Sequence, residues 1–237
     1  VRGYLDSRTL RYLLKRTCTC VLIPQAKCTE RRFLREGVEL ALRTGNTQIL
    51  IGALDLMYHR ELLEEKKAQD LLRSFRENKD DNVRTRAFFI SLLQMPRLGD
   101  LLRQADNGLH KQLCEIEFQG KPAEEISQAI ENPPTSIEEL QQEDLLLLSE
   151  MSSSYQTDIA SLGTLAQAKL GDISALPVLM LLAHERKVEI RQRACRGLAS
   201  FADNPMVKQE LESLMLNDSD ATVRTIAFQV LFTQAKK

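Results

Sequence analysis

Ile190-Arg191-Gln192-Arg193-Ala194 is a helical phrase that this chain of 237 residues repeats toward its C-terminus. An earlier counterpart begins at Ile159 and a later one at Val223-Arg224, at separations of 31 and 33 residues. A fixed period between about 20 and 50 residues is typical of proteins built from stacked structural repeats. We therefore expect an all-α fold in which one helical unit recurs along the chain.

The apolar positions of the phrase share one helix face. Ile190, Ala194 and Leu198 follow each other at intervals of four residues, and Val223, Ala227 and Leu231 do the same. The small alanine lets neighbouring helices approach closely. The positions that we assign to the repeat are Ile159, Gly171, Asp172, Pro177, Ile190, Ala194, Leu198, Asp203, Val223, Ala227 and Leu231.

The turn and the second helix of the unit carry a family resemblance. Leu170-Gly171-Asp172 ends one helix, Pro177 lies at the start of the next, and Ile190-Arg191 opens the following unit. Over residues 158–237 this pattern resembles a HEAT-like repeat of the type first associated with phycobilisome lyases. The resemblance implies a right-handed α-solenoid, a superhelix of antiparallel helix pairs. Val83-Arg84 is a degenerate upstream echo of the same pattern.

Composition agrees with a helical chain. Apolar residues make up 43% and aromatic residues 5% of the sequence, Trp is absent, and Gly and Pro are scarce. Leu, Ala and Glu, which have high helix propensity, are abundant. These proportions exclude a disordered chain and favour a globular one with a substantial core.

Three stretches of the chain are expected to differ in regularity. Residues 1–117 hold degenerate N-terminal helical repeats, residues 118–157 an irregular insertion and an acidic helix, and residues 158–237 regular HEAT-like repeats. The acidic helix is predicted over 137–151, with Thr135 or Ser136 as its N-cap. We expect one continuous solenoid that is interrupted near 118–136.

Charge is distributed unevenly although the net charge is only −1. Residues 1–35 carry nine Lys and Arg against two acidic residues, and much of the compensating negative charge lies between Glu115 and Asp158. Solvated helix faces are commonly charged, so this polarity has an ordinary interpretation as well as a functional one. The basic N-terminal patch consists of Arg8, Arg11, Lys15, Arg16, Arg31, Arg32 and Arg35.

Arginines also recur at one phase of the repeats. Their first interpretation is structural, with Arg191 and Arg224 pairing with aspartates of adjacent turns such as Asp172 or Asp203. Their second interpretation is a ridge that binds a partner or nucleic acid. The ridge would consist of Arg84, Arg86, Arg191, Arg193, Arg196 and Arg224.

Sequence patterns for catalysis or metal binding are missing. Cys18 and Cys20 are separated by one residue, whereas paired zinc ligands usually have two to four between them, and no nearby His completes a set. Five cysteines in a chain of this size argue against a disulfide framework and favour a reducing compartment. No catalytic triad pattern, phosphate loop or His-Glu-x-x-His helix is present. We therefore expect no cofactor, no metal and no enzymatic activity.

The expected function is that of a protein–protein interaction scaffold or adaptor that binds its partner on the solenoid surface. Nucleic-acid binding through the arginine ridge and the basic N-terminal patch is the alternative. An accessory lyase-like or chaperone-like role is a further alternative and rests on the family resemblance alone. No long apolar stretch predicts membrane insertion, and we expect a cytoplasmic protein. The chain begins at Val1 without an initiator Met, which is consistent with a processed chain or an excised domain.

Overall fold

The structure, a computed structural model, describes residues 45–59, 62–64, 66–117 and 136–234, together with Val38, Ala41, Arg43 and Pro134. These ranges contain eleven α-helices, four short 3₁₀ helices and no strand, which confirms the predicted all-α class. Contacts divide the chain into two compact units, residues 1–53 and 54–237. The predicted interruption near 118–136 lies largely outside the described residues, and the boundaries predicted near 117 and 157 stay predictions.

The first unit contributes the beginning of helix α3, Thr47–His59. Asn46 starts this helix, since its side-chain oxygen accepts hydrogen bonds from the backbone N–H groups of Gln48 (3.0 Å) and Ile49 (3.2 Å). Leu50 and Ala53 of this helix are buried.

The second unit begins with the rest of α3 and a group of short helices. They are η2 (Leu62–Glu64), α4 (Lys66–Arg76), α5 (Asp81–Gln94), α6 (Pro96–Ala105) and α7 (Asn107–Glu117). Helix α5 packs against α4, α6 and α7, and α6 also packs against α7. Residues 96–117 form two helices rather than one long helix, because Asp106 has an extended backbone and its carboxylate accepts from the N–H groups of Gly108 and Leu109 at the start of α7.

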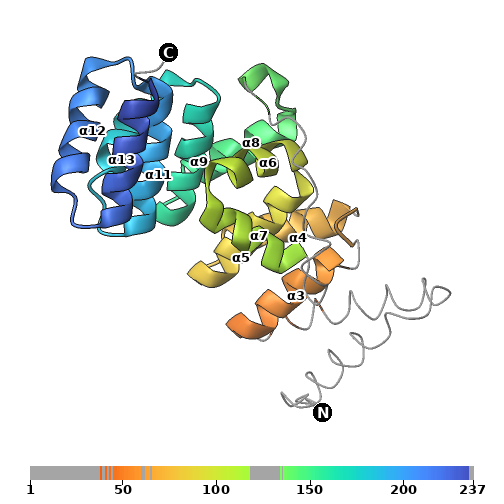
Figure 1. The fold of residues 1–237 in the computed structure, drawn as a ribbon. Helices are drawn as coiled ribbons and strands as arrows, with labels where there is room; N and C mark the ends of the chain where they lie inside the picture. Colours follow the sequence, from red (N-terminus) through yellow and green to blue (C-terminus); the bar gives the residue numbers. More distant parts are fainter. Residues whose placement is uncertain are drawn as a thin grey trace, which may run out of the picture. The chain divides into compact units, whose positions relative to one another are not determined.

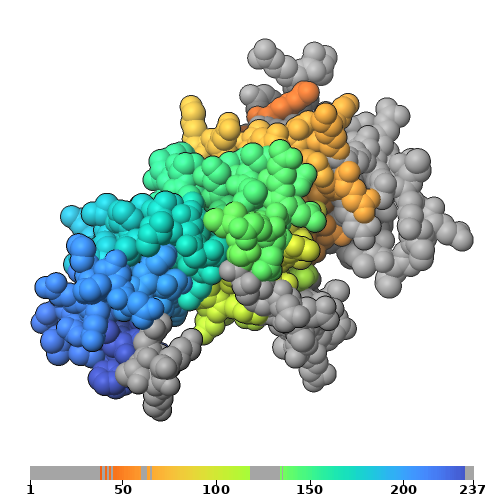
Figure 2. Space-filling view, turned by 90° about the horizontal axis from the view of Figure 1, so that it is seen from above, coloured from red at the N-terminus to blue at the C-terminus, as the bar shows by residue number. Residues whose placement is uncertain are grey.

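The remaining helices form pairs. Their elements are η4 (Ile137–Glu139), α8 (Gln142–Ser152), α9 (Thr157–Lys169), η5 (Ile173–Ala175), α10 (Leu176–Leu182), α11 (Val188–Leu198), η6 (Ala199–Phe201), α12 (Pro205–Asn217) and α13 (Ala221–Gln234). Helices α9, α11 and α13 stack side by side as one layer (Figure 1), and α8, α10 and α12 pack against them as its partners. In the space-filling view these elements follow one another in chain order, from green to blue (Figure 2).

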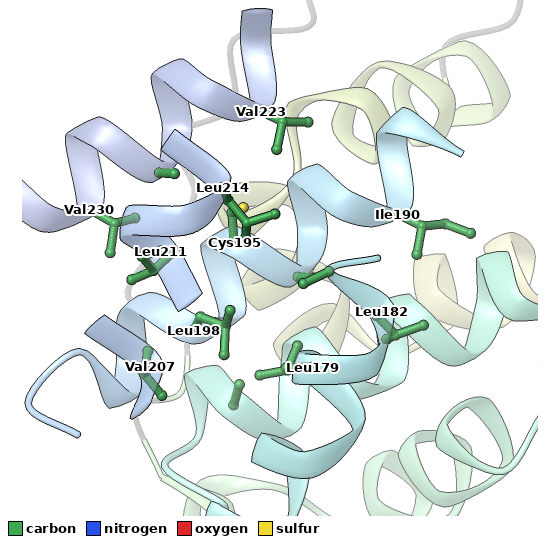
Figure 3. Packing of buried hydrophobic residues seen from close by; sticks show 14 of the residues in the cluster. Leu179, Leu182, Ile190, Cys195, Leu198, Val207, Leu211, Leu214, Val223 and Val230 are labelled. Atoms are coloured by element: carbon green, nitrogen blue, oxygen red, sulfur yellow. The ribbon is translucent and has the colours of Figure 1, made fainter. Parts of the chain in front are cut away.

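The repeat positions lie where the pairs meet. Ile190, Ala194, Leu198, Val223 and Ala227 are at most 1% exposed. They belong to one cluster formed by α10 to α13, in which Leu179, Val207 and Leu211 point toward the same interior (Figure 3). Leu231 packs against this cluster but is only partly buried. Burial of these apolar side chains is the main source of stability for stacked repeats, since each unit buries its face only against its neighbours.

Aspartate or asparagine begins several helices of the second unit. Asp80, Asn204 and Asp220 each accept a hydrogen bond from the backbone N–H two residues later, at 2.8–2.9 Å. These side chains occupy otherwise unpaired N–H groups of the first helical turn. An Asp or Asn at the end of a repeat turn therefore caps the start of the helix that follows it.

The acidic helix begins later than the predicted range of 137–151. Residues 137–139 form the separate 3₁₀ turn η4, and α8 starts only at Gln142. Ser136 caps neither element with its side chain; instead Asp144 accepts from the N–H of Gln141 at 3.1 Å.

The turn at Gly171 follows the prediction, with φ of +80°, a backbone conformation that glycine adopts at little cost.

Candidate functional site

The repeat arginines hold the turns that precede their own helices. Arg84 donates from Nη1 to the carbonyl of Asn78, six residues earlier, at 2.5 Å. Arg191 makes the same contact with Glu185 at 2.9 Å. Arg224 donates to the carbonyl of Asp218 at 2.7 Å. The repeated phase of these arginines therefore has a local cause, because each one satisfies carbonyl groups that the turn leaves without a backbone partner.

Two of these arginines also reach the turn of another helix pair. Arg191 binds both carboxylate oxygens of Asp218, at 2.8 and 2.9 Å, in the turn before α13. Arg84 donates to Gln156 at 3.0 Å, in the turn before α9, and its guanidinium lies 4.2 Å from the centre of the Tyr155 ring. Arg191 therefore pairs with an aspartate of an adjacent turn, as predicted, but that aspartate is Asp218. The named partners Asp172 and Asp203 are wrong.

The correction has a simple geometric reason. Arg191 reaches forward to the turn of the following pair, whereas Asp172 lies in the preceding one and its side chain accepts from the N–H of Ser174. Asp203 is exposed. Arg224 is in the last described helix, and its hydrogen bonds to described residues go to the carbonyls of its own preceding turn, those of Asp218 and Ser219.

The remaining arginines of the predicted ridge divide into two kinds. Arg86 forms a bidentate ion pair with Asp55 at 2.6 and 2.8 Å. Arg193 forms a buried ion pair with Asp106 at 2.5 Å and also donates to Ser161 at 3.1 Å. Arg196 has neither an ion pair nor a hydrogen bond to a side chain among the described residues.

The structure therefore changes the ridge hypothesis. Arg84, Arg191 and Arg193 are only 1%, 8% and 7% exposed, so these three do not belong to a solvent-exposed ridge. Their guanidinium groups are used inside the protein. The basic N-terminal patch (Arg8, Arg11, Lys15, Arg16, Arg31, Arg32 and Arg35) lies outside the described residues.

Arg196 faces a groove, which we call the α6–α13 groove. The groove has a volume of about 490 Å³ and is open to solvent. It is lined by Leu101, Gln104 and Ala105 of α6, Asn107 of α7, Lys169 of α9, Arg196 of α11, Ala199 of η6, and Ile226, Gln229 and Val230 of α13. The groove therefore lies where α6 and α7 cover part of the layer formed by α9, α11 and α13.

The Arg193–Asp106 pair holds the two sides of this groove together. Asp106 separates α6 from α7, whereas Arg193 lies in the middle of α11, 87 residues later in the sequence. Burial alone would raise the pKa of Asp106, but the charge and hydrogen bond of Arg193 outweigh it and leave that pKa below its ordinary value. The carboxylate is therefore ionised at neutral pH, and the ion pair positions the α6–α7 corner on α11.

Two cations line the groove, and no acidic residue is among its described lining positions. Lys169 ends α9 and Arg196 lies in the last turn of α11, where the helix dipole favours positive charge. Burial lowers the pKa of the Lys169 ammonium, and the nearby charge of Arg196 lowers it further. Neither side chain makes an ion pair with another described residue.

Lys169 was not among the residues predicted from the sequence. It directly precedes the Leu170-Gly171-Asp172 turn, a position where a basic residue is explained by the helix dipole alone. Its neighbour across the groove, Arg196, lies 27 positions later and was predicted only as part of the ridge. Their proximity depends on how α9 packs against α11, which is a tertiary contact.

A second cavity, of about 350 Å³, lies between α4, α5 and α8. Its central cation, Arg76, is already paired, since it donates to Glu150 at 2.7 Å and to Ser91 at 2.9 Å. Positive and negative side chains both line this cavity. The α6–α13 groove is the better candidate for a binding site, because both of its charged lining residues are cations and neither forms an ion pair with another described residue.

Other kinds of site find no support in the described ranges. No three His, Cys, Asp or Glu side chains come together there as a metal site requires. The two cysteines in these ranges, Cys114 and Cys195, are buried free thiols. No helix there has the length and apolar character needed to cross a bilayer.

Comparison with known proteins agrees with this architecture. Residues 144–231 match the family described as HEAT repeats, a range that extends from α8 into α13. No curated protein matches the chain. The match and the packing of neighbouring helices confirm the predicted HEAT-repeat α-solenoid, whereas the phycobilisome-lyase type and the right-handed superhelix stay predictions.

Proposed function

We propose that this HEAT-repeat protein binds another protein, and that the α6–α13 groove takes up a segment of the partner. HEAT repeats commonly mediate protein–protein interaction. The observation that carries the proposal is the groove itself. Two half-buried cations there, which form no ion pair with any described residue, lie beside apolar side chains of α6 and α13. The proposed role of this binding is that of a non-catalytic scaffold or adaptor.

The groove is preformed by contacts that do not depend on a ligand. The Arg193–Asp106 pair holds the α6–α7 corner on α11, and the packing of α11 against α9 and α13 fixes the floor. Preorganised surfaces bind with less loss of conformational entropy than surfaces that must first become ordered. This property suits a recognition site that selects one short segment of a partner.

The nucleic-acid alternative has less support. It requires several outward-facing cations, because phosphate contacts provide most of non-specific affinity. Three of the six ridge arginines are instead buried in contacts within the protein. The experiment below nevertheless distinguishes the two partner classes.

The test is an affinity purification from source lysate with the wild-type protein and two variants. Ala105→Trp fills the groove at a position that is already half exposed, whereas Gln112→Trp adds the same bulk on the exposed face of α7 outside the groove. A protein partner should be recovered with wild type and Gln112→Trp, with or without nuclease, and be lost with Ala105→Trp. Circular dichroism melting curves of the three proteins would establish that all are folded.

Two results would contradict the proposal. Equal recovery of the partner by Ala105→Trp would show that the interaction does not use the groove. Recovery that disappears after nuclease treatment would identify nucleic acid rather than protein as the primary ligand.

A further inference from the structure

We infer that the partner segment is an acidic peptide, whose carboxylates pair with Lys169 and Arg196 while an adjoining apolar side chain lies on Ile226 and Val230. This inference rests on the proposed function and specifies the chemistry of the partner at the same groove. Its basis is charge complementarity, the burial of the two cations, and the apolar character of the lining beside them.

The first argument concerns the charge of the groove. The ten lining residues include two cations and no anion. Arg196 interacts electrostatically with the Asp106 carboxylate, but the oxygens of that carboxylate accept from Arg193, Gly108 and Leu109. Arg193 and Asp106 neutralise each other, so Lys169 and Arg196 give the described lining of the groove an excess of two positive charges.

The second argument concerns the cost of holding these cations together. Burial and the like charge of Arg196 both disfavour the ammonium form of Lys169. The C-terminal dipoles of α9 and α11 offset only part of this cost, because a helix end carries roughly half an elementary charge. A bound carboxylate would relieve the repulsion and accept hydrogen bonds from both side chains, and such charge-assisted hydrogen bonds are among the strongest in proteins.

The third argument concerns the neighbouring lining. Ile226 and Val230 lie one helical turn apart on α13, and Ala199 and Leu101 add apolar surface near them. The amide side chains of Gln104 and Asn107 can bond a peptide backbone. An acidic residue next to an apolar one matches this combination of surfaces.

The same lining argues against nucleic acid as the occupant. Proteins that bind single strands combine a basic groove with aromatic side chains on which bases stack. The α6–α13 groove has two cations and no aromatic residue among its described lining positions. A peptide with one or two carboxylates uses both cations, whereas a nucleic-acid backbone would extend past them.

The experiment is a selection from a displayed library of random dodecapeptides on the wild-type protein. Bound peptides are then tested on Lys169→Gln/Arg196→Gln, which removes both charges but retains long polar side chains, and on Ala105→Trp, which fills the groove. Lys208→Gln is the matched control, because Lys208 is an exposed lysine of α12 that does not line the groove. Short labelled single-stranded and duplex DNA serve as competitors.

Enriched peptides should carry at least two Asp or Glu residues next to an apolar residue. Their dissociation constants, measured by fluorescence anisotropy, should rise at least about tenfold with Lys169→Gln/Arg196→Gln and stay unchanged with Lys208→Gln. Affinity should also fall as the salt concentration rises, since these charges are partly solvated.

The outcomes separate this inference from the proposed function. Peptides that lack acidic residues but are displaced by Ala105→Trp would overturn the acidic-peptide inference and leave the groove as a protein-binding site. Acidic peptides that bind the charge-removed variant equally well would also overturn the inference. If the selection yields no peptide whose binding depends on the groove, both the inference and the proposed function are overturned. If DNA displaces the peptides and its binding requires Lys169 and Arg196, the ligand of the groove is nucleic acid rather than a peptide.

Discussion

Gly163 of α9 lies so close to Ser152 of α8 that a Cβ on the glycine would be 2.5 Å from the serine backbone nitrogen and 2.7 Å from its Oγ. Real Cβ atoms essentially never approach other heavy atoms at such a distance. The absence of a side chain at Gly163 therefore sets how closely α8 packs against α9, the helix that carries Lys169 at its end.

Gly163→Ala should destabilise this helix pair, because α8 or α9 must move to admit the added methyl group. We expect the free energy of unfolding to fall by about 1–3 kcal/mol, the usual cost of overpacking. Denaturant unfolding measures this change, and helix-resolved hydrogen exchange locates it. Gly52→Ala is the control: nothing lies within 4 Å of the Cβ it would add, so alanine should stabilise α3 by up to about 1 kcal/mol. Equal stability of Gly163→Ala and wild type would contradict the close-packing argument.

Arg193→Met should leave the Asp106 carboxylate buried without its guanidinium partner. Breaking a buried ion pair from one side typically costs about 3–5 kcal/mol. Asp106→Asn keeps a side-chain acceptor for the N–H groups that begin α7, so the double variant should recover part of the loss. Denaturant unfolding of the four proteins of this cycle gives the coupling energy, which should be about 1–3 kcal/mol. If the two substitutions change the free energy of unfolding additively, the Arg193–Asp106 pair does not join α6 and α7 to α11.

Acid should destabilise the protein through Asp218. Burial alone would raise the pKa of this carboxyl, but hydrogen bonds from Arg191 and the N–H of Asp220 outweigh it and hold the pKa below its ordinary value of 3.8. A carboxyl whose pKa is lower in the folded state contributes stability above its unfolded pKa and loses that contribution as pH falls through the folded pKa. The free energy of unfolding should therefore begin to decline when the pH falls to about one unit above 3.8, and it should decline further as the pH is lowered.

Asp218→Asn should be less stable than wild type at neutral pH and should show a shallower acid decline. Urea unfolding at a series of pH values measures both effects. Ser219→Ala, in the same turn, changes no charge and should follow the wild-type pH profile. If Asp218→Asn loses as much stability at acid pH as the wild type does, the Arg191–Asp218 pair is not a source of the acid destabilisation.

Cys195 should be unreactive in the folded protein. The residue is 0% exposed, and burial raises the pKa of its thiol to about 12. The thiolate is the reactive form, so only about one molecule in ten thousand would carry it near pH 8. Mass spectrometry after iodoacetamide treatment should find the Cys195 peptide unmodified under native conditions and modified in denaturant. Rapid native alkylation would contradict the burial of this residue.

Local sequence patterns predicted the C-terminal repeats well. Apolar residues at intervals of four, such as Ile190, Ala194 and Leu198, indicate a buried helix face, and all three are buried. The Gly171-Asp172 turn was equally readable, because positive φ and a side-chain acceptor are local properties. The break at Asp106 was harder to predict, since only its extended backbone and its capping of α7 reveal it.

The sequence by itself determined that this protein is helical, that its helices repeat at intervals of 31 and 33 residues, and that one arginine recurs at a constant phase. These features depend on interactions over a few residues, such as the contact of Arg191 with the carbonyl of Glu185. Only the tertiary structure decided which cations are paired and which line a groove. Arg193 meets Asp106 across 87 positions and Arg196 lies beside Lys169, because helix packing brings together side chains whose separation in sequence carries no information about their distance.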